Sequence, residues 1–350
     1  MNPSISQKER IISLDIIRGL ALFGILLINV GAFKVIMEGD PLPDYSGING
    51  IINTLIIIFV QKKFFSIFSF LFGVGLYIFA SRAESRGDRP RWRMARRLLI
   101  LLLLGIIHVF IFWGTILPVY AIIGLFLIPF YHTTVSTLKK WLMGMTSIYI
   151  ISLMVKIFLP SQGAVSSILD IFSNDAMQIF IMFLAGFLTA KSGWLTLIQE
   201  LSKPIRWIQM ASFLLFVGFS LWIWNASQSG SSNVDSVTGL GSLPTTLFYL
   251  TTLFLLLENK QMVKFLTPIS RVGQMAFTNY VAQSIIGTAI ISTIGLEVVS
   301  PKDILYIAVL IYMIQIIFST IWFKFFSMGP LEKLWRLMTY GTKPATKNPS

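Results

Sequence analysis

The chain consists mainly of long apolar runs that recur at even spacing and are separated by short polar connections. A run of about 20 apolar residues is long enough to cross a bilayer as a helix. The pattern predicts about ten such helices, at residues 16–36, 64–81, 98–113, 116–131, 141–158, 176–190, 207–224, 243–257, 275–294 and 304–325. Residues 51–60 are also apolar, and are expected to form either an interfacial helix or the first turns of a long second helix. We therefore expect an all-α, polytopic integral membrane bundle.

Composition supports this class of protein. Of the 350 residues, 55% are hydrophobic and only 12% are charged, whereas about a quarter of the residues in a soluble domain are charged. The even recurrence of the apolar runs predicts a single integral domain over residues 1–350. Its N-terminal helices fall within residues 1–158, and its C-terminal helices fall within 175–341. The absence of cysteine excludes disulfides, thiolate nucleophiles and thiolate metal sites.

Basic residues accumulate on alternate connections, which predicts the orientation of the bundle. Seven arginines lie between residues 82 and 97 alone. Only five of the 28 basic residues are assigned to the outer side, namely Lys34, Lys62, Lys63, Lys156 and Lys302. Because positively charged loops stay in the cytoplasm, both termini are expected there, with an even number of spans, in the inner membrane of a bacterium. The outer connections at 39–50, 160–174 and 226–241 are the longest, and the last is expected to be flexible because it is rich in Ser and Gly.

The net charge of +13 is explained by this topology, together with attraction to anionic lipid headgroups. The arginines flank helices, and a single aromatic residue, Trp92, lies among them, which argues against a nucleic-acid partner. The expected partners are the lipid bilayer and a small-molecule substrate.

Ionisable residues inside a span are costly and usually functional, and the first such group lies in the first predicted helix. Asp15 and Arg18 are three residues apart on one helix face, where they can pair. Asn29 follows Arg18 by 11 residues, which places it on nearly the same face and about 16 Å deeper. The alternative is a structural one, in which the ion pair anchors the helix at the headgroups and Asn29 is hydrogen-bonded inside the bundle.

The second group surrounds His108, which is the one histidine inside a predicted span. His108 follows Arg97 by 11 residues on the same helix face, and Arg96 lies beside Arg97. A neutral imidazole exchanges protons near neutral pH, so His108 is the best candidate for a general base. Trp113 and Tyr120 are expected to line a pocket or to belong to the interfacial aromatic belt. A buried, structurally satisfied histidine is the alternative.

The third group lies in the ninth predicted helix, where Asn279 and Gln283 are four residues apart with Tyr280 beside them. The tenth predicted helix carries Gln315 and Ser319 at a similar spacing. Such stripes either join the two helices by hydrogen bonds or line a substrate path.

Several of these residues occur in motifs that resemble the YeiB-like bacterial membrane proteins. The motifs are Leu14, Asp15, Arg18, Gly19, Ala21, Leu22, Gly24 and Asn29, followed by residues 64–76, 96–117, 272–286 and 329–341. The C-terminal half of that family is a domain of unknown function. The family is distantly similar to membrane acyltransferases, including the heparan-α-glucosaminide N-acetyltransferase group and bacterial sugar O-acyltransferases.

The sequence departs from these families at two positions. The O-acyltransferases carry a histidine 11 residues after the arginine of the first helix, where this chain has Asn29. The YeiB-like pattern after the histidine usually reads GDIL, where this chain has Gly114, Thr115, Ile116 and Leu117. A carboxylate that would orient and charge-stabilise the imidazole is therefore replaced by a hydroxyl.

The resemblance implies a membrane acyltransferase-like protein that moves an acyl group from a cytoplasmic donor to an acceptor at the membrane or the outer face. His108 would activate an acceptor hydroxyl or itself carry the acyl group. Arg18, Arg96 and Arg97 would bind the phosphates of an acyl-coenzyme A type of donor, and no permanently bound cofactor is expected. Asn279, Tyr280 and Gln283 would line the acceptor path. The alternative is a carrier of a small solute that performs no chemistry.

Overall fold

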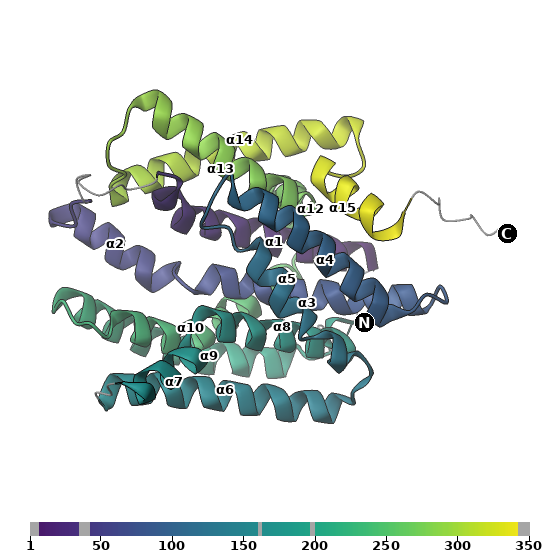
Figure 1. Cartoon of the computed structure of the whole chain (residues 1–350), viewed down its shortest axis with the longest axis horizontal. Coiled ribbons are helices and arrows are strands. Elements are labelled where there is room, and N and C mark those ends of the chain that lie inside the picture. Colours follow the sequence, from purple (N-terminus) through teal and green to yellow (C-terminus); the bar gives the residue numbers. More distant parts are fainter. Residues whose placement is uncertain (1–6, 35–42, 160–162, 197–199, 342–350) are drawn as a thin grey trace.

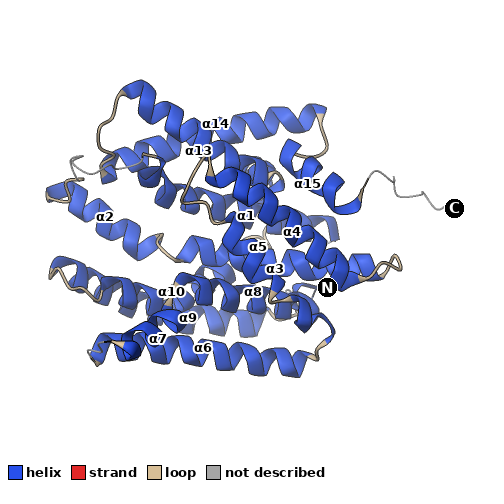
Figure 2. Ribbon diagram, in the orientation of Figure 1, coloured by secondary structure: helices blue, strands red, loops and turns tan. Residues whose placement is uncertain are grey.

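The computed structural model describes residues 7–34, 43–159, 163–196 and 200–341, and within these residues the regular structure is entirely helical (Figure 2). The elements are α1 (Gln7–Asn29), η1 (Val30–Phe33), α2 (Gly47–Phe59), α3 (Lys63–Glu84), α4 (Pro90–Val109), α5 (Leu117–Leu125), η2 (Ile128–His132), α6 (Val135–Phe158), α7 (Ala164–Ser173), α8 (Asp175–Lys191), η3 (Trp194–Thr196), α9 (Ser202–Gln228), α10 (Val234–Leu256), α11 (Lys260–Phe265), α12 (Thr267–Gln274), α13 (Ala276–Ile294), α14 (Pro301–Phe325) and α15 (Pro330–Tyr340). The all-α class is therefore confirmed.

The long helices run roughly along one direction and form a layered bundle (Figure 1). A middle layer holds α1, α3, α4 and α5. It has α12, α13 and α14 on one side, and α6, α8, α9 and α10 on the other. The start of α1 and the helix α15 lie at the same end of the bundle. The largest hydrophobic core joins the middle layer to α8 and to the pair α13–α14.

Seven helical segments of the described chain are long and apolar enough to cross a membrane, so this is a multi-pass membrane protein. They are Ile12–Phe33, Gly47–Glu84, Val135–Phe158, Ala164–Lys191, Ser202–Gln228, Val234–Leu256 and Pro301–Phe325. The most apolar window of α9 is only 11% buried, and its exposed side chains include Leu214 and Leu221. An apolar surface of this extent needs lipid around it, since a soluble protein would bury it.

The other three predicted spans coincide with α4, α5 with η2, and α13, which are less apolar or shorter. Four arginines lie within the first eight residues of α4, and α5 has only nine residues. Helix α13 carries buried Asn279, Gln283 and Ser284. All ten predicted segments are helical, and the count of ten membrane crossings stays a prediction.

Two helix pairs approach so closely that they meet through glycines. A methyl group on Gly73 of α3 would overlap the carbonyl oxygen of Phe183 in α8, and one on Gly186 of α8 would overlap the carbonyl oxygen of Phe70. Gly273 of α12 meets the backbone of Asp15 in α1 in the same way. Without a Cβ, the backbones pack directly, which is how helices associate when no hydrophobic effect operates between them.

Two of the predicted outer loops are wrong. Most of 226–241 is helical, because α9 continues to Gln228 and α10 begins at Val234. Small residues of α10, such as Thr238 and Gly239, are buried in the bundle, whereas Ser229, Gly230 and Ser232 lie exposed in the turn between the two helices. Within 160–174, α7 spans Ala164–Ser173, and residues 160–162 lie outside the described residues.

Residues 51–59 belong to α2, and Val60 begins the short break before α3 (Figure 1). The two helices together form one candidate span, Gly47–Glu84, as expected for the first turns of a long helix. Residues 39–42 of the predicted outer loop, residues 35 and 36 of the first predicted helix, and Lys343 and Lys347 of the basic tail lie outside the described residues.

Candidate active site

His108 lies in the last turn of α4, just before the chain reverses into α5. The backbone N–H of Phe112 donates to the carbonyl oxygen of His108 at 2.8 Å, which closes a tight turn. This turn returns Thr115 to the imidazole. Pro118 in the first turn of α5 then starts a helix where its missing N–H costs no hydrogen bond.

Both ring nitrogens of His108 have a hydroxyl partner, and the side chain is only 2% exposed. Nδ1 lies 2.8 Å from Oγ1 of Thr115, and Nε2 lies 2.9 Å from Oγ of Ser284 on α13. The hydroxyl of Ser284 also donates to the carbonyl oxygen of Val281 at 2.8 Å. In this arrangement it accepts from Nε2–H, and the hydroxyl of Thr115 donates to Nδ1. The result is a hydrogen-bonded chain, Thr115–His108–Ser284, that links α4, the turn after it and α13.

Tyr280 lies beside this chain and positions the turn. Its ring packs edge-on against the imidazole at a centroid distance of 5.6 Å, and its hydroxyl oxygen accepts from the backbone N–H of Ile116 at 3.1 Å. The side chains of Asn29 and Thr115 also interact with this hydroxyl. The structure thus brings three predicted site residues together, since Asn29, His108 and Tyr280 come from α1, α4 and α13.

Asp15, Arg18 and Arg97 form a second group at the opposite end of α4. Nη1 of Arg18 lies 2.6 Å from Oδ1 of Asp15, as predicted from their spacing. The guanidinium of Arg97 lies 3.9 Å from the ring centroid of Trp335 in α15 and 4.6 Å from that of Phe79. Eleven residues of α4 separate the backbone of Arg97 from that of His108 by about 16 Å.

Arg96 is turned about 100° around α4 from Arg97 and faces the surface of the bundle. Its Nε donates to the carbonyl oxygen of Met338 in α15 at 3.1 Å. The two arginines therefore lie in different environments, although the sequence analysis predicted the same role for both.

Asn279 and Gln283 are engaged between α13 and α14. Nδ2 of Asn279 donates to Oγ of Ser319 at 3.0 Å, and Nε2 of Gln283 donates to Oε1 of Gln315 at 3.0 Å. Nε2 of Gln315 donates back to the carbonyl oxygen of Asn279 at 2.7 Å. These amides join the two helices, which is the structural alternative left open by the sequence.

The two aromatic residues predicted near His108 lie elsewhere. Trp113 is 67% exposed on the turn after α4. Tyr120 is buried against α3, where its hydroxyl donates to the carbonyl oxygen of Phe65 at 2.9 Å and bonds with Ser69. Neither has a described contact with the imidazole.

Sequence reasoning missed the role of Ser284 as the partner of Nε2. The sequence pattern could have indicated this role, because Ser284 follows Tyr280 by four residues and so lies on the same face of α13.

Sequence reasoning also missed the burial of Lys62 and Lys63, which it assigned to the outer side. The structure buries both at the break between α2 and α3, with Lys62 7% and Lys63 0% exposed. Lys62 has a φ of 66°, a left-handed conformation that is uncommon for a residue with a Cβ. Nζ of Lys63 donates to the carbonyl oxygen of Ile57 at 2.7 Å. The missed signal was a pair of lysines between two apolar runs, since an ammonium at such a position needs a partner inside the bundle.

The partners of Lys62 are carboxylates at the starts of two other helices. Its Nζ lies 2.6 Å from Oδ1 of Asp175 in α8 and 3.1 Å from Oδ1 of Asp235 in α10. Its carbonyl oxygen accepts from Nε2 of Gln178, which also donates to Ser242. Three helices that are distant in sequence are therefore joined at the break.

Replacing both Asp175 and Asp235 with asparagine is expected to lower the free energy of unfolding by about 3 kcal/mol. This is the lower end of the range for breaking a buried ion pair, because the two carboxylates are themselves more than half exposed. Thermal unfolding of the purified protein in detergent measures the change.

The matched control is Asp170→Asn, which removes the exposed ion pair with Lys156 and is expected to cost at most about 1 kcal/mol. Equal losses in the double variant and in this control would show that the ammonium of Lys62 does not depend on its carboxylates.

The fold and the site define a multi-pass helical membrane protein with polar residues buried in its bundle. Residues 189–342 match the family model described as "Protein of unknown function (DUF418)". The chain is 31% identical to an uncharacterized 39.9 kDa protein from the amylase 3′ region of Bacillus acidopullulyticus, over 98% of this chain and 97% of that protein. It is 31% identical to the uncharacterized protein YxaH of Bacillus subtilis over 95% of each chain.

YeiB of Escherichia coli is 26% identical to this chain, over 95% of this chain and 96% of YeiB. The chain belongs to the YeiB-like family of membrane proteins, as its motifs predicted. No solved structure matches it.

Proposed function

We propose that this protein is a membrane acyltransferase that moves an acyl group from a cytoplasmic donor to an acceptor hydroxyl at the membrane or the outer face. The observation that carries the proposal is the chain Thr115–His108–Ser284, which gives a buried imidazole a hydroxyl on each ring nitrogen. A base aligned in this way is what activation of an alcohol requires.

The roles in this chain follow from which nitrogen faces which hydroxyl. In the reactive tautomer Thr115 accepts from Nδ1–H and Nε2 is free to take a proton. The hydroxyl of Ser284 then turns from the carbonyl oxygen of Val281 toward Nε2. The acceptor hydroxyl attacks the acyl carbonyl of the donor, and its proton passes through Oγ of Ser284 to Nε2. The imidazolium then returns this proton to the departing thiolate of the donor, so that His108 is neutral again.

The separation of the two polar groups indicates the kind of donor. The backbone of Arg97 lies about 16 Å along α4 from that of His108, so a phosphate bound by Arg97 needs a long arm to present an acyl group to the imidazole. An acyl-coenzyme A type of donor has this construction. The guanidinium of Arg97 stacks between two aromatic rings, which holds its planar donor fork in place for a phosphate.

The proposal requires that α4 and α13 cross the membrane, with ten spans and both termini in the cytoplasm of a bacterial inner membrane. Two observations support this arrangement. The ten predicted segments are all helical, and the start of α1 lies at the same end of the bundle as α15.

Because the natural chain contains no cysteine, single-cysteine variants test this topology directly. We expect Arg91→Cys to react with a membrane-impermeant maleimide only after cells are lysed, since it lies on the inner side. Glu297→Cys, in the exposed turn between α13 and α14, is expected to react on intact cells and serves as the control. Labelling of Arg91→Cys on intact cells would overturn the orientation and the assignment of a cytoplasmic donor.

Acyl transfer itself is tested with membranes that contain the overproduced protein and acetyl-coenzyme A labelled in its acetyl group. The expected result is label in the glycan or lipid fraction in proportion to the amount of protein. Label that stays with the donor, for acyl chains of every length tried, would contradict the proposal.

A carrier without chemistry is the second candidate, and the break between α2 and α3 favours it. Interrupted helices with buried charges form the substrate sites of many transporters, and here the break holds Lys62 and Lys63. Uptake of a labelled anionic solute into proteoliposomes without an acyl donor, lost in Lys63→Met and retained in His108→Gln, would support the carrier.

A further inference from the structure

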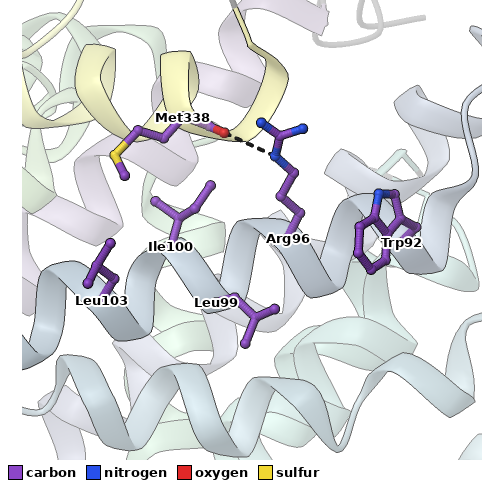
Figure 3. Close-up of a pocket in the computed structure, with 6 residues that line it drawn as sticks. All are labelled: Trp92, Arg96, Leu99, Ile100, Leu103 and Met338. Carbon is purple, nitrogen blue, oxygen red and sulfur yellow. Dashed lines mark hydrogen bonds between the residues drawn. The ribbon is translucent and has the colours of Figure 1, made fainter.

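A groove lies on the surface of the bundle between α4 and α15, at the level of the arginine-rich segment (Figure 3). Its volume is about 460 Å³, and it is lined by Trp92, Arg96, Leu99, Ile100, Leu103 and Met338. Five of these residues lie on α4 at spacings of four, three, one and three residues, so they form one stripe along the helix. The groove therefore runs parallel to α4, from the charged end of the helix toward the middle of the bundle.

The groove changes character along its length. Leu99 and Leu103 are 49% and 48% exposed, and with Ile100 and Met338 they make its deeper part entirely aliphatic. Trp92 lies at the other end, one helical turn beyond Arg96, and is also exposed. Exposed indole rings of this kind are enriched at the boundary between hydrocarbon and headgroups.

Arg96 supplies the charge at this boundary. Its Nε donates to the carbonyl oxygen of Met338 at 3.1 Å (Figure 3), so the guanidinium is held at one of its three nitrogens. Within the described part of the chain, no carboxylate forms an ion pair with Arg96. Arg93, one turn earlier, donates to the carbonyl oxygen of Thr339, which ties the same end of α15 to α4.

We propose that this groove is a binding site for one anionic phospholipid of the adjacent leaflet. The phosphate would accept hydrogen bonds from the terminal nitrogens of Arg96, and Trp92 would lie at the level of the glycerol. One acyl chain would follow Leu99, Ile100 and Leu103. Basic pockets beside membrane-spanning helices recognise anionic lipids in this way, and the site is separate from the proposed chemistry at His108.

Helix α15 packs on α4 and forms one wall of the groove through Met338. Its Glu332 accepts the backbone N–H groups of Phe277 and Thr278 at the start of α13, so α15 is attached at one end to α13. At its other end it is attached to α4 by arginines. A lipid in the groove would fill the remaining space between these two attachments.

The test compares lipid retention by purified variants in phosphatidylcholine nanodiscs doped with phosphatidylglycerol. Native mass spectrometry counts the phosphatidylglycerol that stays bound when the protein is released. We expect one retained molecule for the natural protein and about fivefold weaker retention for Arg96→Gln, the loss expected for one basic side chain at a membrane surface. Leu103→Trp, which fills the aliphatic part and keeps the charge, is expected to lose the lipid as well.

Arg91→Gln is the matched control, because it removes the same charge from an exposed position of α4 outside the groove and is expected to retain the lipid. Equal losses in Arg96→Gln and Arg91→Gln would overturn the site and leave only general attraction to anionic membranes. Equal retention of phosphatidylcholine would overturn its specificity for anionic lipid. Displacement by inorganic phosphate would show that the groove binds free anions and would overturn the lipid as its occupant.

Discussion

Replacing His108 with glutamine is expected to lower acyl transfer by at least about a hundredfold, the typical contribution of a positioned general base. A glutamine side chain can still donate to and accept from the hydroxyls of Thr115 and Ser284, so the bundle is expected to fold normally. The loss is expected in kcat, with little change in KM for the donor, because the donor phosphates bind about 16 Å away. Rates measured with labelled acetyl-coenzyme A give both constants.

Two further variants separate a chemical role of His108 from a structural one. Thr115→Asp supplies the carboxylate that stands at this position in the GDIL pattern, and is expected to raise the rate because a carboxylate stabilises the imidazolium better than a hydroxyl does. Ser284→Ala is expected to slow transfer less than His108→Gln does, since a water molecule or the acceptor can approach Nε2 directly. Full activity in His108→Gln, together with a lowered melting temperature, would identify the imidazole as a packing residue.

Replacing Gly73 with alanine is expected to destabilise the bundle by about 1–3 kcal/mol or more, the usual cost of adding a methyl group to a filled interior. The new methyl would overlap the backbone of Phe183, which cannot rotate away as a side chain could. Helices α3 and α8 would therefore have to separate along their length, and the contacts between Phe72 and Phe183 would be lost. Thermal unfolding in detergent measures the effect.

Gly75, two residues further along α3, provides the control. A methyl group there meets no atom within 4 Å, so Gly75→Ala is expected to leave stability unchanged or to raise it by up to about 1 kcal/mol through helix propensity. Gly186→Ala should resemble Gly73→Ala, and the double variant should cost less than the sum, because one separation of the helices relieves both overlaps. Equal stability of Gly73→Ala and Gly75→Ala would contradict the close contact of α3 and α8.

Local sequence predicted the helices well, and it failed where the rules for soluble proteins were applied to a membrane interior. Residues 226–241 were expected to form a loop, yet α9 continues to Gln228, and α10 begins at Val234 and buries Thr238, Gly239 and Gly241. Small residues permit close helix packing in lipid, so composition alone cannot separate a flexible loop from a packed helix there. The burial of Lys62 and Lys63 was missed for a related reason. Their carboxylate and carbonyl partners meet them at a break between helices, and hydropathy does not reveal such a break.

The candidate site was predicted only in part, for a reason that concerns distance along the chain. Helical spacing placed Arg97 and His108 on one face of α4. It also predicted the pairing of Asp15 with Arg18, which the structure shows. The same spacing could not show that Arg96 faces the surface of the bundle while Arg97 stacks on Trp335. Both environments depend on where α15 packs. Nor could it place Trp113 and Tyr120, since the turn after α4 directs them away from the imidazole.

The sequence by itself determined that this chain is a helical membrane protein, because the length and apolar character of each run are local properties set by the thickness of the bilayer. It also determined which polar side chains the bundle must accommodate, among them His108, Arg18 and Asn279. Only the tertiary structure decided their partners. Ser284 reaches His108 from 176 residues away, and a hydrogen bond between such positions exists only because α4 and α13 come together in the folded bundle.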